Sequence, residues 1–352
     1  MGGRAIQYKF TISGLEGQRG RIASRTHHHE DRIILKNPIN SDALPGREGI
    51  SHRLRHRVRV RHLPVQPAPI QRYTFVVMAQ FKEVEQDVAK HYDGAAFEAE
   101  LSRLPRDCPV EMGVTLRWLA RVTRAGDVVA EIGVGGGHYT EFLARRACHL
   151  HLVDISSRLL DAVHDKLRQA GFDGQIAGRH QVSGANLEGV PSEIVDIALL
   201  LGPLYHLQTL AERRGSVEES ARILKPSGAL FAAGINRLAY FRDLLRMKFA
   251  PVSQRVAFHH QYLRDGNVDP EHAPPLGYGH LSTASEFLEL FEDRFEKMAF
   301  LGVESFTSAW QGIFGDLPAA EKEVWLDLVE DTCQTPEGIG QSDHFLFVGR
   351  KR

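Results

Sequence analysis

The sequence predicts an α/β fold in which helices cover a doubly wound, mostly parallel sheet of seven strands. Short apolar segments typical of buried strands alternate along the chain with segments of helical periodicity, which is the pattern of a parallel sheet. Glycines follow the first of these strands directly, and an acidic residue ends the second. Because ligands bind at the carboxyl ends of parallel strands, the sequence also predicts a ligand site at that edge.

The first 77 residues differ from the rest in charge. They hold 14 Lys and Arg against 5 Asp and Glu, which leaves 29 against 39 for residues 78–352 out of totals of 43 and 44. The Arg-rich run 53–62 and the Pro-containing stretch 64–69 have no sustained helical period. We therefore predict a disordered basic leader over 1–77 and a folded domain over 78–352, where an amphipathic helix starts at Met78. A basic arm that binds nucleic acid or membrane is the alternative for the leader.

The elements follow in order. Helical spacing recurs over residues 80–123, and these helices are predicted to cover one sheet edge. The five strands expected next are 127–134, 149–155, 175–182, 195–201 and 229–236. The helices expected between them are 138–147, 158–170 and 217–224.

The segment after the fifth strand breaks this alternation. Residues 238–280 are rich in aromatic side chains and His, and we predict that they form an insert serving as a substrate lid. Helices are expected at 285–294 and 319–332. The segments 295–306 and 344–351 are expected to close the sheet as an antiparallel pair.

A glycine-rich turn follows the first strand. Gly133, Gly135 and Gly137 alternate there, and glycine permits positive φ and a close approach of the backbone to a ligand. The next helix offers free N–H groups and a positive dipole end to a carboxylate. Glu131 is placed for an ammonium group, and Asp154, 21 residues beyond Gly133, is placed for both hydroxyls of a ribose.

Nicotinamide-dependent oxidoreductases share this spacing of turn and acid. A dinucleotide fingerprint GxGxxG starting at Gly133 requires glycine at position 138, where this chain has His138. A pyrophosphate also has no use for Glu131. The turn therefore favours a nucleoside with an amino-acid group over a dinucleotide, and a glycine-rich turn without any ligand is the purely structural alternative.

Four segments carry a resemblance to a known family. EIGVGGG at 131–137 resembles the ExGxGxG first motif of class I S-adenosylmethionine-dependent methyltransferases, and Asp154 resembles their second-motif acid. Residues 195–207 and 221–230 are similar to the family's fourth-strand motif and to the turn before its fifth strand. The resemblance implies a Rossmann-like fold, S-adenosylmethionine as cofactor, and in-line methyl transfer to a small molecule. The cofactor contacts it implies are Glu131, Gly133, Val134, Gly135, Gly137, Asp154, Ile155, Ala185 and Leu201.

One position departs from the family pattern. Many relatives carry Gly-Asp-Ala after the third strand, with the Asp at the adenine amino group, whereas this chain has Ser183, Gly184 and Ala185. Adenine recognition would then fall to backbone groups or to Ser183 or Asn186.

The acceptor side is predicted from residues after the fourth strand and in the insert. His206 is the expected base, and a helix start at this point is the equally weighted structural alternative. The expected substrate contacts are Tyr92, Tyr205, His259, His260 and Tyr262. His149 and His151 alternate along one strand, which core packing explains, so we predict no metal site.

Composition bounds the remaining possibilities. Three widely spaced cysteines favour a reducing cytoplasm, and no apolar run is long enough to span a bilayer. The acidic balance of residues 78–352 disfavours nucleic acid as a partner and favours a small-molecule substrate. A tRNA or other nucleic-acid methyltransferase, a nicotinamide oxidoreductase and a noncatalytic protein that kept the fold are the alternatives.

Overall fold

The computed structural model describes residues 84–247 and 252–352. The predicted leader 1–77 and the predicted helix start at Met78 lie outside the described residues. Within the described part, none of the helices has the length and apolar character needed to cross a membrane.

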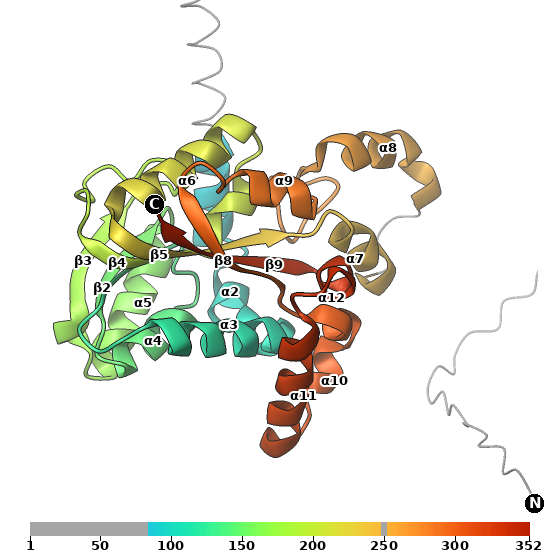
Figure 1. Ribbon diagram of the computed structural model, residues 1–352. Coiled ribbons are helices and arrows are strands. Elements are labelled where there is room, and N and C mark those ends of the chain that lie inside the picture. The colour runs from blue at the N-terminus through green and yellow to red at the C-terminus, as the bar shows by residue number, and fades with distance from the viewer. Residues whose placement is uncertain (1–83, 248–251) are drawn as a thin grey trace, which may run out of the picture. The chain divides into compact units, whose positions relative to one another are not determined.

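Seven strands form one sheet in the order β3-β2-β1-β4-β5-β9-β8 (Figure 1). Neighbours among β1 to β5 pair in parallel, whereas β9 pairs antiparallel with both β5 and β8. The strands are β1 Val128–Ile132, β2 His149–Asp154, β3 Ile176–Gln181, β4 Val195–Leu200, β5 Leu224–Ile235, β8 Phe295–Gly302 and β9 His344–Lys351. The predicted mostly parallel, seven-stranded sheet with an antiparallel closing pair is confirmed.

Helices cover both faces of this sheet (Figure 1). Successive strand residues point to opposite faces, so Val129 packs into one apolar cluster and Ala130 into the other. The helices of the Val129 face are α3 Pro109–Val122, α4 His138–Arg145, α5 Ser157–Gln169 and α11 Ala319–Thr332. Those of the Ala130 face are α6 Leu210–Ile223 and α9 Ala284–Glu289.

Residues that precede β1 are helical, as predicted. Residues 84–93 form one helix, and α2 spans Phe97–Asp107 ahead of α3. The two short helices near the carboxyl end are α10 Gln311–Gly315 and α12 Pro336–Gln341.

Two boundaries differ from the prediction around the fifth strand. The helix expected at 217–224 begins at Leu210, because Thr209 and Glu212 form a capping box that starts it. β5 begins at Leu224 rather than Ala229, and its pairing with β4 shifts register between Val195 and Ile197.

The insert after β5 has an apolar cluster of its own. It contains α7 Ala239–Met247, α8 Val256–Asp265 and a two-stranded ribbon of β6 Asn267–Val268 and β7 Gly279–His280. Tyr240, Tyr262 and Val268 belong to this cluster. Arg242 and Arg246 of α7 form ion pairs with Asp343, which precedes β9, and so hold the start of the insert against the sheet.

Candidate active site

A cavity opens at the carboxyl ends of β1, β2 and β4, with about 1100 Å³ of empty space that includes open solvent. Eleven of the predicted site residues line it, and they fall into two groups. The glycine side of the cavity comprises Glu131, Gly133, Val134, Gly135, Gly137, Asp154 and Ile155. The tyrosine side comprises Tyr92, Leu201, Tyr205 and His206.

The turn between β1 and α4 uses the conformational freedom of its glycines. Gly133, Gly135 and Gly137 have φ values of +84°, +50° and +68°, a region that other residues rarely adopt. A Cβ on Gly135 would lie 2.9 Å from Oε1 of Glu100, and one on Gly133 would lie 2.9 Å from Cδ of Pro203. The bend therefore depends on glycine at these three positions, which leaves their backbone facing the cavity.

Glu131 is a buried acid on the glycine side. Its side chain accepts a hydrogen bond from the Thr140 hydroxyl, and only 3% of the residue is exposed. Burial raises the pKa of this carboxyl to about 8, against the opposing effect of the Thr140 hydrogen bond. Among the described residues no Lys, Arg or His forms an ion pair with it. A cationic group of a ligand would therefore be the ionic partner of the buried carboxylate.

Asp154 ends β2 and faces the same turn. Its carboxylate accepts hydrogen bonds from the backbone N–H groups of Gly135 at 3.3 Å and Ser156 at 2.9 Å. Burial raises its pKa to about 6, although both hydrogen bonds favour the charged form. The side chain is therefore fixed at the strand end, where it can accept hydroxyl donors.

At Gly184, the position that departs from the family pattern, the space for a side chain is occupied by Pro203. A Cβ on Gly184 would lie 2.6 Å from Cβ of Pro203, so an aspartate does not fit there in this backbone. Ser183 and Gly184 line the cavity, and the Ser183 hydroxyl accepts a hydrogen bond from the N–H of Ala185 at 3.2 Å. Ala185, a predicted cofactor contact, and Asn186 are not among the residues that line it.

His206 is held by two hydrogen bonds. Its Nδ1 lies 3.1 Å from the carbonyl oxygen of Tyr278, and since a carbonyl only accepts, Nδ1 carries the hydrogen. Nε2 then accepts from the Tyr92 hydroxyl at 2.9 Å. Burial lowers the pKa of the imidazole to about 4, so the ring is neutral at physiological pH.

Helix α2 contributes an ion pair that the sequence did not reveal. Nε of Arg103 donates to Oε2 of Glu100 at 2.8 Å, and both residues line the cavity. Glu100 lies beside Gly135, as the Cβ distance above shows, so the Arg103 charge sits near the glycine side. Three-residue spacing on an amphipathic helix is the one sequence feature that links the two, and it is shared with many solvent-exposed pairs.

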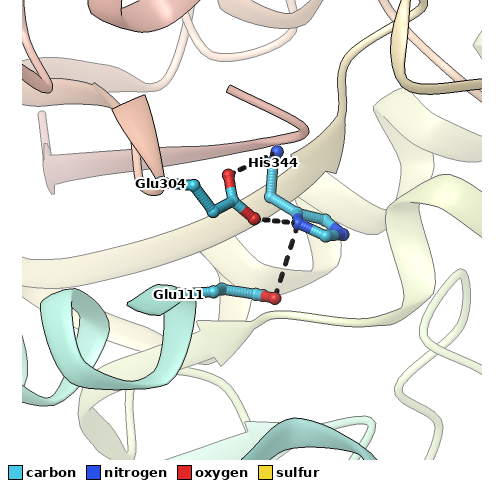
Figure 2. A group of neighbouring side chains, drawn as sticks. All are labelled: Glu111, Glu304 and His344. Carbon is cyan, nitrogen blue, oxygen red and sulfur yellow. Dashed lines mark hydrogen bonds and ion pairs between the residues drawn. The ribbon is translucent and has the colours of Figure 1, made fainter. Parts of the chain in front are cut away.

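A second set of charges comprises Glu111, Glu304 and His344 (Figure 2). Glu111 of α3 lines the cavity, and its Oε2 lies 3.5 Å from Nδ1 of His344 at the start of β9. Glu304, which follows β8, accepts hydrogen bonds from Nδ1 and the backbone N–H of His344, the latter at 2.9 Å. Burial lowers the pKa of His344, but the two carboxylates outweigh it and raise the pKa to about 10.

These three residues form an ion triad. Their donor atoms lie within 4.8 Å of one another, a spacing that a metal ion could also use. The imidazolium of His344 already supplies a cation between the two carboxylates, so we assign no metal to this group. The residues are far apart in sequence, and no local spacing connects them.

Three predicted substrate contacts lie away from the cavity. Tyr262 is fully buried in the apolar cluster of the insert, and its hydroxyl donates to the carbonyl of Arg237. His259 is buried against Tyr240, whereas His260 is exposed on α8. None of the three lines the cavity, so we do not retain them as substrate contacts. The aromatic character of Tyr262 and His259 reflects packing within the insert.

The sequence matches one protein family model, described as a methyltransferase domain, over residues 130–232. A ubiquinone biosynthesis O-methyltransferase of Xylella fastidiosa (strain 9a5c) is 30% identical over 117 residues, which are 33% of this chain and 45% of that protein. A protein of the same name from Methylococcus capsulatus is 29% identical over 172 residues, covering 45% of this chain and 70% of that protein. The chain thus spans less than half the length of the Xylella relative.

The alignments with two solved structures have low TM-scores and low sequence identity. The N-methyltransferase NodS from Bradyrhizobium japonicum aligns with a TM-score of 0.43 and 16% identity over 72% of this chain and 95% of its own. The [4+2]-cyclase SpnF aligns with a TM-score of 0.45 and 16% identity over 76% of this chain and 96% of its own.

The family match begins within β1 and ends within β5, and it therefore includes the glycine turn, Asp154 and the loop that carries His206. These are the segments on which the sequence resemblance was based. The part of this chain that matches the methyltransferase domain model is therefore the part that forms most of the cavity's glycine side and the loop of His206.

Proposed function

We propose that the protein transfers a methyl group from S-adenosylmethionine to a small-molecule acceptor. The observation that carries this proposal is the buried Glu131 carboxyl, which has no cationic partner in the described structure and stands beside a glycine-rich bend. An amino acid ammonium matches this carboxyl. The relatives' shared name, methyltransferase, agrees with that assignment.

The residues of the glycine side suit the separate parts of this cofactor. Glu131 would hold the ammonium, and Asp154 would accept hydrogen bonds from the ribose hydroxyls. Arg103 and the free N–H groups at the start of α4 offer positive charge to the amino acid carboxylate. Ser183 and backbone groups near Gly184 remain for the adenine, while Ile155 and Leu201 provide apolar surface. When bound, the cofactor supplies a methyl group already activated on a sulfonium.

His206 is the residue that we propose as the base. Its Nε2 carries no hydrogen in the neutral imidazole and accepts a hydrogen bond from the Tyr92 hydroxyl. When a substrate hydroxyl takes the place of the Tyr92 hydroxyl, Nε2 can take its proton. As the new oxygen–carbon bond forms, the carbon–sulfur bond breaks, its electron pair stays on sulfur, and the proton ends on Nε2. Tyr205 lines the same wall and helps to exclude water.

We infer a quinone-like or phenolic acceptor and a cytoplasmic location. The relatives are named for ubiquinone biosynthesis, and hydroxyl acceptors agree with a His base. The cavity is lined by several carboxylates and by Arg103, a balance that disfavours nucleic-acid phosphates. Cys108, Cys148 and Cys333 are all free thiols, in keeping with a reducing compartment. The boundaries 78–352 of the domain remain a prediction.

Cofactor titration tests the proposal. S-adenosylhomocysteine at about 100 times its Kd should stabilise the fold by roughly 2.7 kcal/mol, seen as a raised melting temperature. A shift with NAD(H) instead would indicate an oxidoreductase, and a shift with neither would indicate a noncatalytic protein. A methyl-transfer screen of metabolite extracts with a labelled donor then identifies the acceptor.

A further inference from the structure

A second pocket adjoins the first on its tyrosine side. It has about 640 Å³ of empty space, open solvent included, and we call it the outer pocket. The residues that line both it and the main cavity are Val88, Tyr92 and His206. The two spaces are therefore separated by those three side chains.

A hydrogen bond joins two of the side chains in this separating wall, Tyr92 and His206. The Tyr92 hydroxyl donates to Nε2 of His206, while the insert fixes the other side of the ring through the Tyr278 carbonyl. A group that enters from the outer pocket and takes the place of the Tyr92 hydroxyl would therefore meet Nε2 of His206. That atom is the proton acceptor of the proposed reaction.

The insert side of the outer pocket offers proline, leucine and tyrosine side chains. Pro270, Pro274, Leu276 and Tyr278 line it from the insert. Proline and tyrosine faces pack well against flat rings. The insert thus does border a ligand-sized space, but through residues 270–278 rather than through α8.

His91 adds one polar group to this pocket. It lines the outer pocket, and its Nε2 is buried without a hydrogen-bond partner among the described residues. A buried nitrogen in this state is costly, and a hydroxyl or carbonyl group of a ligand would relieve the cost. Asp87 also lines the pocket but is exposed to solvent.

We propose that the outer pocket binds the body of the methyl acceptor, a hydroxylated aromatic compound whose reacting hydroxyl replaces that of Tyr92 at His206. This inference rests on the proposed function, since it places the acceptor relative to the cofactor cavity. It also explains why His206 is shared by the two spaces. His91 then binds a second polar group of the same compound.

The test uses 2-naphthol as a probe, with 2-methoxynaphthalene as the analogue that lacks a hydroxyl hydrogen. Binding to the full chain is measured by probe fluorescence in saturating S-adenosylhomocysteine. Pro274→Trp fills the outer pocket, and Pro275→Trp is the matched control, because both prolines are exposed but only Pro274 lines the pocket. We expect Pro274→Trp to weaken 2-naphthol binding about tenfold or more, with Pro275→Trp unchanged and the same cofactor-induced thermal shift in both. The methoxy analogue should bind more weakly than 2-naphthol.

Several results would overturn the inference. They are the absence of 2-naphthol binding, equal effects of the two proline variants, or competition between 2-naphthol and S-adenosylhomocysteine for one site. His91→Phe gives a second check that keeps an aromatic ring at this position: it should weaken the binding of 2,7-dihydroxynaphthalene, which carries a second hydroxyl, and leave the binding of 2-naphthol unchanged. The proposed function can also fail separately. If S-adenosylhomocysteine gives no thermal shift, while 2-naphthol binds and only Pro274→Trp prevents its binding, the cofactor assignment is wrong and the outer pocket is still the binding site of the aromatic compound.

Discussion

The glycine side and the tyrosine side of the cavity are built in different ways. The glycine side comes from one short stretch, since the β1 turn and the end of β2 lie within residues 131–156. On the tyrosine side, His206 forms hydrogen bonds with Tyr92, which is 114 residues away in the sequence, and with Tyr278, which is 72 residues away. A local motif can therefore specify the glycine side, whereas the tyrosine side exists only once three distant segments have packed together. Four predictions follow from this difference and test it.

Substitution of the glycine turn should have the largest effect. We expect Gly135→Val to weaken S-adenosylhomocysteine binding roughly 150-fold, because holding a β-branched residue at this positive φ costs about 3 kcal/mol. Calorimetric titration measures the affinity. Gly174→Ala is the control, since no atom lies within 4 Å of a Cβ there. Unchanged binding in Gly135→Val would place the cofactor elsewhere.

On the tyrosine side, loss of the base should affect turnover rather than cofactor affinity. His206→Ala is expected to lower kcat roughly 100-fold, with the Kd for S-adenosylhomocysteine within about twofold of the parent value. Steady-state kinetics on the acceptor found by the screen, together with titration, separate the two quantities. An unaffected rate would remove His206 from the reaction and leave the methyltransferase domain assignment intact.

Cofactor binding should release a proton from Glu131. The free protein holds this carboxyl protonated below about pH 8, and the ammonium of the cofactor requires the charged form. Affinity should therefore fall about tenfold for each pH unit below 8, until other groups titrate. Calorimetry in two buffers of different ionisation enthalpy reports the proton, and Glu131→Gln should abolish its release. Equal heats in both buffers for the parent protein would contradict this account.

The ion triad should give the smallest effect, on stability alone. The pKa of His344 is about 10 in the fold and about 6.5 when unfolded, so its contribution is complete below pH 6.5 and is lost as pH rises toward 10. Between pH 6.5 and pH 10 the melting temperature should fall further in the parent protein than in His344→Gln, by roughly 5 °C. His260→Gln, at an exposed position, is the control. Parallel pH curves for the parent and His344→Gln would show that the triad adds no stability through charge.

The strands and the glycine turn could be predicted because each depends on neighbours in sequence. An apolar run followed by glycine determines where β1 ends, and Asp154 follows β1 by a fixed crossover. The predicted start of β5 was wrong, because its lysine–proline–serine–glycine stretch has the composition of a turn. In the structure this stretch is an irregularity within β5, where the pairing with β4 passes from Leu224 to Ala229.

The substrate contacts were less predictable for a physical reason. Tyr262 and Pro274 lie in the same insert, and aromatic character favoured Tyr262, but burial in the insert's own cluster removes that side chain from any ligand. Which face of a short helix turns inward depends on tertiary packing. Likewise Glu111, Glu304 and His344 meet only because α3 packs beside the ends of β8 and β9.

The contact between Gly184 and Pro203 links two positions that a sequence comparison treats as independent. Introducing an aspartate at 184 alone would force it against the proline ring, so it should unsettle the loop after β4 before any adenine contact could form. Introducing the aspartate found in many relatives therefore first requires a smaller residue in place of Pro203. In a set of homologues, the same geometry would appear as paired exchange at these two sites, with each lineage keeping either the acid or the ring.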